Sequence, residues 1–315
     1  MPSRILYSLL VLTFAAGVDS TPKPKASAPS GEVQVAMKNV MYHFTAPIAV
    51  HILQLQGSFT PTKAGSIVVF DDRNSFTLNL ASAEIAISCN SLAQVMNDDV
   101  FSASNAPIKK ITISNKNNQL DIKGQLHSKG DVPFEATGTL SANGDGRIRF
   151  HAEHVKAVHV PVKGLLDLVG LDLAKLISTK GIPGVSIDKD DLILNPQEIL
   201  PPPHIHGAVT AVRLQGNEIV QVFGTPQGSS FAARQPGNYM AYRDSDLRFG
   251  KLTMNKADLI LLDMDPQDPF DFYLDHYKDQ LVAGYTKTTP EFGLRVYTRD
   301  YNKLHKKAAT NRTGE

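Results

Sequence analysis

Alternating apolar and polar residues run through most of the chain from residue 32 onward, and this period of two constrains the fold most strongly. In residues 32–44, Val33, Val35 and Met37 alternate with smaller or polar neighbours. Successive side chains of a β-strand point to opposite faces, so the pattern predicts strands with one buried face. Comparable segments lie at residues 48–59, 66–72, 75–89, 109–115, 119–126, 132–141 and 147–155. Because strands and helices do not alternate regularly, we expect an α+β, mostly β fold with antiparallel sheets.

Turn-forming residues divide these segments. Residues 143–146 have the sequence NGDG, which is the strongest hairpin signal in the chain. Residues 215–217 (QGN) predict a second hairpin. The apolar residues change phase between Ile52 and Leu53, which indicates a β-bulge.

Two segments have the pattern of a helix. In residues 90–101, Asn90 or Ser91 is the expected N-cap, and the apolar residues share one face. The other segment begins at Pro161 and ends before Gly181. A helix on one sheet face needs an apolar stripe only somewhat wider than ~100°, whereas this one is apolar over about two thirds of its circumference. Its apolar residues are Leu165, Leu166, Leu168, Val169, Leu171, Leu173, Ala174, Leu176 and Ile177.

The order of these elements resembles a known family. The segments AEIAISCNSLAQVMN, LDIKGQL, FEATGTLS, VPVKGLLDLVGLDLAKL and GVSIDKDDLILNP look like the exported LmeA-type phospholipid-binding proteins and, more widely, the tubular lipid-binding (TULIP, BPI-like) family. The resemblance covers about residues 32–224 and rests on pattern, without a signature residue. It implies a strongly curved antiparallel sheet that wraps one long and one short helix, with the acyl chains of a lipid in the seam.

An enclosed apolar helix has two interpretations. If the enclosure is loose, it leaves an apolar cavity, which binds apolar ligands. If it is tight, the helix is only part of the hydrophobic core. We expect the ligand site to be lined by Leu92, Met96, Leu165, Leu166, Val169, Leu173 and Ile177. The expected function is non-catalytic binding of a phospholipid or other hydrophobic ligand in envelope lipid transport or maintenance, with transient contact to a membrane surface.

The first residues have the pattern of an export signal. Arg4 precedes the 14-residue apolar stretch 5–18, which is too short to span a bilayer comfortably. Cleavage after Ser20 would place the protein in the periplasm or outside the cell, and an uncleaved signal anchor is the alternative. Residues 21–31 are rich in Pro, Ala, Ser and Lys and predict a linker.

The remaining boundaries follow from composition. Residues 225–237 predict a second linker, 238–302 a β-rich C-terminal extension outside the resemblance, and 303–315 a frayed basic tail. The net charge of +1 argues against a nucleic-acid partner. Cys89 is the single cysteine, so no intramolecular disulfide can form, and we expect it to be buried. The oligomeric state is not indicated.

Catalytic and metal motifs are absent from the sequence, so we expect no cofactor and no metal site. His204 and His206 share a strand face without a local third ligand, and they predict an exposed strand start. The acidic residues around 263–275 lack the pattern of a calcium loop and indicate an acidic surface turn. An unrecognised hydrolase would need a paired nucleophile and base in a polar pocket.

The alternative function is a structural or protein-interaction module of the envelope. In that case the 238–302 extension would supply an aromatic contact surface. The residues expected to form it are Tyr239, Tyr242, Phe270, Phe272, Tyr273 and Tyr277.

Overall fold

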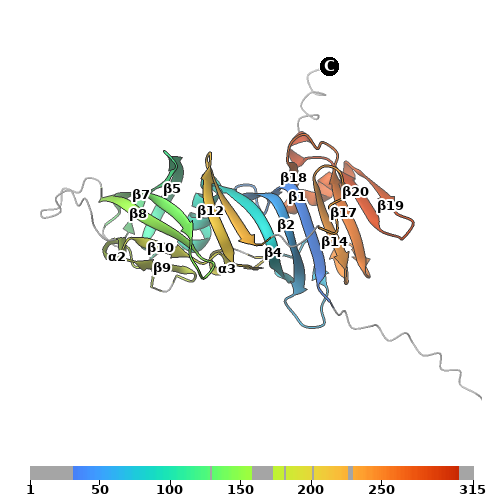
Figure 1. Cartoon of the computed structure of the whole chain (residues 1–315), viewed down its shortest axis with the longest axis horizontal. Helices are drawn as coiled ribbons and strands as arrows, with labels where there is room; N and C mark the ends of the chain where they lie inside the picture. Colours follow the sequence, from blue (N-terminus) through green and yellow to red (C-terminus); the bar gives the residue numbers. More distant parts are fainter. Residues whose placement is uncertain are drawn as a thin grey trace, which may run out of the picture.

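The computed structural model describes residues 31–127, 130–157, 173–180, 182–200, 202–225 and 230–304. The predicted signal segment, most of its linker, and the expected site residues Leu165, Leu166 and Val169 lie outside these residues. The described chain is mostly β with few helices, as predicted. It forms an elongated molecule in which a smaller sheet at one end is followed by a larger sheet along the long axis (Figure 1).

The larger sheet has 11 strands and is built outward from an antiparallel centre. That centre consists of β1 (Val33–His43), β2 (Ala49–Pro61) and β4 (Phe76–Ser88). Beyond β4 lies the hairpin of β12 (Val209–Gln215) and β13 (Glu218–Gly224). Beyond β1 lie β14 (Tyr239–Asp244), β17 (Ala257–Asp263), β20 (Leu294–Thr298) and β19 (Tyr285–Thr288). Two short strands pair in parallel, β11 (Ile205–His206) with β4 and β18 (Phe270–Tyr273) with β1.

The smaller sheet has six antiparallel strands, and a third sheet of three short strands packs beside the larger one. The six strands are β5 (Ile108–Lys116), β6 (Gln119–Leu126), β7 (Val132–Ala142), β8 (Ile148–Ala157), β10 (Asp191–Leu194) and β9 (Val185–Asp188). The three short strands are β3 (Val68–Val69), β15 (Leu247–Phe249) and β16 (Leu252–Met254).

The helices are short. The first predicted helix is α1 (Cys89–Val95), which continues as a π-helix over Met96–Val100. Its N-cap is Ser88 and not Asn90 or Ser91, because the Ser88 hydroxyl accepts the Ser91 N–H at 3.0 Å. The others are α2 (Leu173–Leu176), α3 (Pro196–Ile199), the 3₁₀-helix η3 (Leu274–His276) and α4 (Tyr277–Val282). Among the described residues, none of these is long and apolar enough to cross a membrane.

One apolar core runs through both sheets. It joins Leu55 and Phe223 of the larger sheet to Ile113 and Phe150 of the smaller one, and the π-helix that follows α1 bridges them with the buried Met96. Cys89 is buried at the start of α1, as expected, and burial raises the pKa of its thiol. The two sheets therefore share a single interior and do not form separate cores.

Residues 238–302, predicted as an extension, contribute strands to the larger sheet. β14 pairs along Gln34–Lys38 of β1, and β18 pairs with the end of the same strand. The described part of the predicted 225–237 linker is packed, because Ala232 is buried against Ala36 and Ile260 on the outer face of that sheet. After β13 the chain therefore crosses back over the larger sheet and adds the strands that lie beyond β1.

The predicted local features of the strands are confirmed. The β2–β4 register shifts between Ile52 and Gln54, which is the expected bulge. β7 and β8 form a hairpin around residues 143–146, and β12 and β13 form one around residues 215–217. His204 and His206 are exposed, as expected.

The β7–β8 hairpin offers a stability test at a glycine. The register shifts between Thr137 and Gly138, and a Cβ atom at Gly138 would lie 1.9 Å from the His151 carbonyl oxygen. We expect Gly138→Ala to lower the free energy of unfolding by about 2 kcal/mol, because neither backbone can move without breaking the ladder. Gly144→Ala in the same hairpin meets no atom within 4 Å and should change stability by less than about 0.5 kcal/mol. Urea unfolding midpoints compare the two, and equal midpoints would contradict the expected clash.

Candidate functional site

Three apolar cavities follow one another through the shared core. The first, of about 110 Å³, lies on the inner face of the larger sheet, and the second and third, of about 50 and 40 Å³, extend toward the smaller sheet. The first two share Ile87, Leu200 and Gln221 as lining residues, whereas the second and third share Met96 and Phe150 among others. The shared walls place the cavities in one row.

The first cavity is lined by alternate residues of the central strands and by a loop that crosses them. Leu55 and Phe59 of β2 point into it from the face opposite the exposed Gln54, and the bulge between Ile52 and Gln54 brings Ile52 onto the same face. Leu200 and Ile205 close it from the segment that connects the smaller sheet back to the larger one. Apart from the Tyr42 hydroxyl and the Gln221 carboxamide, its lining side chains carry no polar group among the described residues.

The Tyr42 hydroxyl remains neutral in this setting. Burial raises the pKa of Tyr42, an effect that the Arg73 guanidinium partly offsets and the Asp275 carboxylate reinforces. The ring itself is 8 % exposed and packs against Phe44 and Phe272 at centroid distances of 4.9 and 5.6 Å. The cavity wall therefore presents aromatic and aliphatic surface at any ordinary pH.

Four of the seven predicted site residues line these cavities. Leu92 lines the second, Met96 lines the second and third, and Leu173 and Ile177 line the third. Leu165, Leu166 and Val169 lie outside the described residues. The first cavity was not predicted, because most of its walls come from β1, β2, β4 and β13, and α1 contributes Val95 alone.

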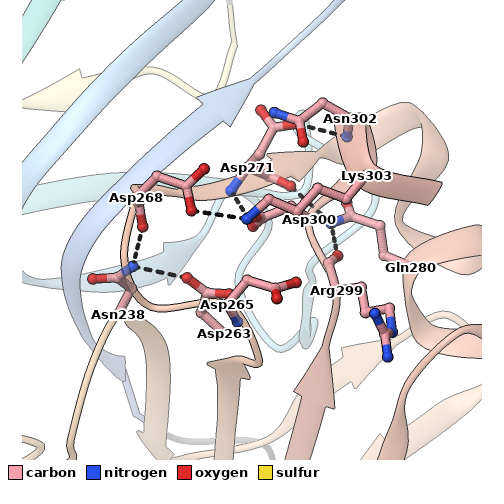
Figure 2. Close-up of polar contacts among 10 residues, drawn as sticks. All are labelled: Asn238, Asp263, Asp265, Asp268, Asp271, Gln280, Arg299, Asp300, Asn302 and Lys303. Atoms are coloured by element: carbon pink, nitrogen blue, oxygen red, sulfur yellow. Dashed lines mark hydrogen bonds and ion pairs between the residues drawn. The ribbon is translucent and has the colours of Figure 1, made fainter. Parts of the chain in front are cut away.

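Apart from the cavities, a cluster of polar residues lies near the C-terminal ends of β17 and β20 (Figure 2). Asp263 and Asp271 are 9 and 6 % exposed, so the prediction of an acidic surface turn is wrong for these two carboxylates. Asp300, which joins them from outside that turn, is 0 % exposed. Buried carboxylates persist only with partners, and here each has several. Asp263 accepts from the Asn238 amide at 2.7 Å and from the Asp265 backbone N–H at 2.7 Å.

Lys303 supplies the positive charge of this cluster. Its Nζ lies 2.7 Å from Asp300 Oδ2 and 2.8 Å from Asp268 Oδ1 (Figure 2). Lys303 was expected to open the frayed tail, and the structure places it instead in the fold. Burial raises the pKa of Asp300 to about 6, and the Lys303 ammonium works against this rise.

The same cluster is where a cation could bind. One carboxylate oxygen each from Asp263, Asp265 and Asp300 lies within 4.8 Å of the others. Hard divalent cations prefer such oxygens. The ammonium of Lys303 already lies against Asp300, and backbone and amide donors occupy Asp263, so two of the three carboxylates are paired within the protein.

His43 and Asp271 form the arrangement closest to an acid–base pair. His43 Nε2 lies 2.8 Å from Asp271 Oδ1, and the imidazole stacks on Tyr273 at 3.8 Å. His43 Nδ1 is buried and hydrogen bonds to no group among the described residues. A nucleophilic mechanism needs a hydroxyl or thiol bonded to the base, and none is present at this imidazole in the described part of the chain.

The aromatic residues of 238–302 do not form the contact surface expected for an interaction module. Tyr239, Tyr242, Phe270, Phe272 and Tyr277 are each less than 5 % exposed and belong to the hydrophobic cores. Tyr273 is half-buried. The large apolar side chains exposed in this region are Leu252, Val282, Tyr285 and Phe292.

In comparisons with known proteins, no family model, curated protein or solved structure matches the chain.

Proposed function

We propose that this chain is an exported protein that binds a lipid or other hydrophobic ligand in the row of apolar cavities, without covalent chemistry. The observation that carries the proposal is the shared apolar lining of the three cavities, which extends from the larger sheet to the smaller one. Apolar cavities of this kind stay dry and take apolar guests. In this proposal the fold is TULIP-like and the protein is periplasmic or extracellular. Its ligand is a phospholipid, and it acts in envelope lipid transport or maintenance through transient contact with a membrane surface.

The volumes indicate how much of a ligand is held. A cavity of about 150 Å³ admits one benzene molecule. The first cavity, at about 110 Å³, therefore receives a group of slightly smaller size, such as the end of an acyl chain. Each buried methylene contributes roughly 0.8 kcal/mol, so five or six of them would give about 4 to 5 kcal/mol. A complete two-chain lipid would require the surrounding strands to separate further.

Native mass spectrometry tests this function. The full chain should be exported by a bacterial host, purified from the periplasm and analysed before and after denaturation with organic solvent. We expect an added mass in the native spectrum that is lost on denaturation and that matches a lipid in the extract. A bare chain mass that does not change after incubation with phosphatidylethanolamine vesicles would overturn the proposal.

A substitution that fills the first cavity tests its location. Ile85 lines this cavity and is half-buried, and the chain contains no tryptophan. We expect Ile85→Trp to occupy the space, to reduce ligand retention by at least about tenfold and to fluoresce at the short wavelengths typical of an apolar site. Val222, half-buried on the opposite face of β13, provides the matched control, and Val222→Trp should retain the ligand. Full retention by a folded Ile85→Trp would place the ligand elsewhere.

A further inference from the structure

Gln221 lies at the junction of the first and second cavities. It lines both, together with Ile87 and Leu200. On β13 it alternates with Ile219, which lines the second cavity, and Phe223, which lines the first. A polar side chain thus marks the point where one apolar space passes into the next.

The direct neighbours of this half-buried carboxamide are apolar. Ile85 of β4 and Val212 of β12 are its direct cross-strand neighbours. Directly opposed residues of antiparallel strands have Cβ atoms about 5 Å apart, so these two side chains flank it closely. The Gln221 side chain makes no hydrogen bond within the described part of the protein. Because Gln221 is half-buried, a ligand that closes over it would remove its remaining contact with water. Leaving an amide without a partner in apolar surroundings costs roughly 1–3 kcal/mol, so a ligand that supplies a partner would be favoured.

We propose that Gln221 determines ligand specificity by hydrogen bonding to an oxygen that lies between two apolar arms of the ligand. One arm occupies the first cavity and the other passes through the second toward the third. The carboxamide offers two donors and an acceptor, so a carbonyl, ester or hydroxyl oxygen satisfies it. This inference rests on the proposed function, because it assumes that the cavities hold a ligand.

Two probes of equal length separate the hydrogen bond from apolar burial. 5-Nonanone has one carbonyl group between two four-carbon arms, which are short enough for these cavities, and nonane lacks only that oxygen. Both would be titrated against the exported full chain carrying N-phenyl-1-naphthylamine, whose fluorescence falls on displacement. We expect wild type to bind the ketone about five- to tenfold more tightly than the alkane, as one net hydrogen bond would give.

Gln221→Leu should lose the preference for the ketone and bind nonane at least as tightly as 5-nonanone, because the carbonyl oxygen then has no partner. It should also bind nonane at least as well as wild type does. Gln54→Leu, an exposed substitution of the same type on β2, should keep the wild-type preference. Gln221→Met is a second variant of similar length, and it should match Gln221→Leu. A wild-type protein that binds both probes equally, or a Gln221→Leu variant that keeps the preference, would overturn the inference. Failure of wild type to take up the naphthylamine or either probe would instead overturn the proposed function.

Discussion

Phe70→Ala is expected to lower the free energy of unfolding by about 4 kcal/mol, the largest effect of any single substitution considered. Phe70 is 1 % exposed and follows the short strand β3. Its ring stacks on Phe249 at 4.5 Å and meets Tyr242 edge-on at 5.5 Å. Truncation removes this burial and leaves a void that the neighbouring rings cannot fill, since they belong to different sheets. Urea unfolding of wild type and variant measures the difference.

The same variant also tests the first cavity, because Phe70 is one of its walls. Removing the ring should join the new void to the existing space, and benzene should then raise the melting temperature of the variant by more than that of wild type. Phe292→Ala is the matched control, since that ring is 93 % exposed, and we expect its effect to stay below about 0.5 kcal/mol. A loss below 1 kcal/mol in Phe70→Ala would contradict the packing described for this ring.

Local sequence signals predicted the local structure. The phase change near Ile52, the turn at residues 143–146 and the helix near residue 90 each depend on neighbouring residues alone, and all three are present. The strands and the mostly β class follow from the same period of two. The Ser88 cap was missed by two residues, because several serine and asparagine residues precede the helix and each is a suitable cap.

Pairings between distant segments were not predictable in the same way. β14 joins β1 although about 200 residues separate them, and nothing in either strand specifies its partner. The burial of Asp263 likewise depends on Asn238, and that of Asp271 on His43, both of which come from other segments. Composition showed an acidic stretch, but the partners that allow its burial appear only in three dimensions.

The first cavity was hidden for a related reason. Its walls are ordinary apolar strand residues, which have the same pattern whether they pack tightly or leave a space. The sequence did contain one usable signal in EIVQVFG, residues 218–224. Both faces of this strand are apolar in its interior, and Gln221 alone breaks the pattern, so a polar residue that faces the core could have been singled out.

Lys303→Met is expected to lower the free energy of unfolding by about 3 kcal/mol at pH 8. The substitution leaves the fully buried Asp300 carboxylate without its ionic partner, and removing one member of a buried pair costs roughly 3–5 kcal/mol. We take the lower end of that range because the Lys303 side chain is 33 % exposed. The lost contact to Asp268, whose side chain is 51 % exposed, adds little.

The pH dependence of this loss identifies its cause. The Asp300 pKa of about 6 in the folded protein lies above its ordinary value of 3.8, so its contribution to stability is complete below pH 3.8 and is lost as pH rises through 6. Without Lys303 the pKa of Asp300 should rise further, because the ammonium lowers it. The difference between wild type and Lys303→Met should therefore fall below about 1 kcal/mol at pH 5, where Asp300 is protonated in both folded proteins, and grow toward pH 8.

Two further variants separate charge from packing in this network. Asp300→Asn in the Lys303→Met background removes the buried charge but keeps an oxygen for the Asp271 backbone N–H, which Asp300 Oδ1 accepts at 2.9 Å. We expect it to restore most of the stability lost at pH 8. Lys251→Met, at an exposed lysine, should have little effect at either pH. A loss in Lys303→Met that is equal at pH 5 and pH 8 would show that the methylene stem of Lys303 stabilises the fold, and not its charge.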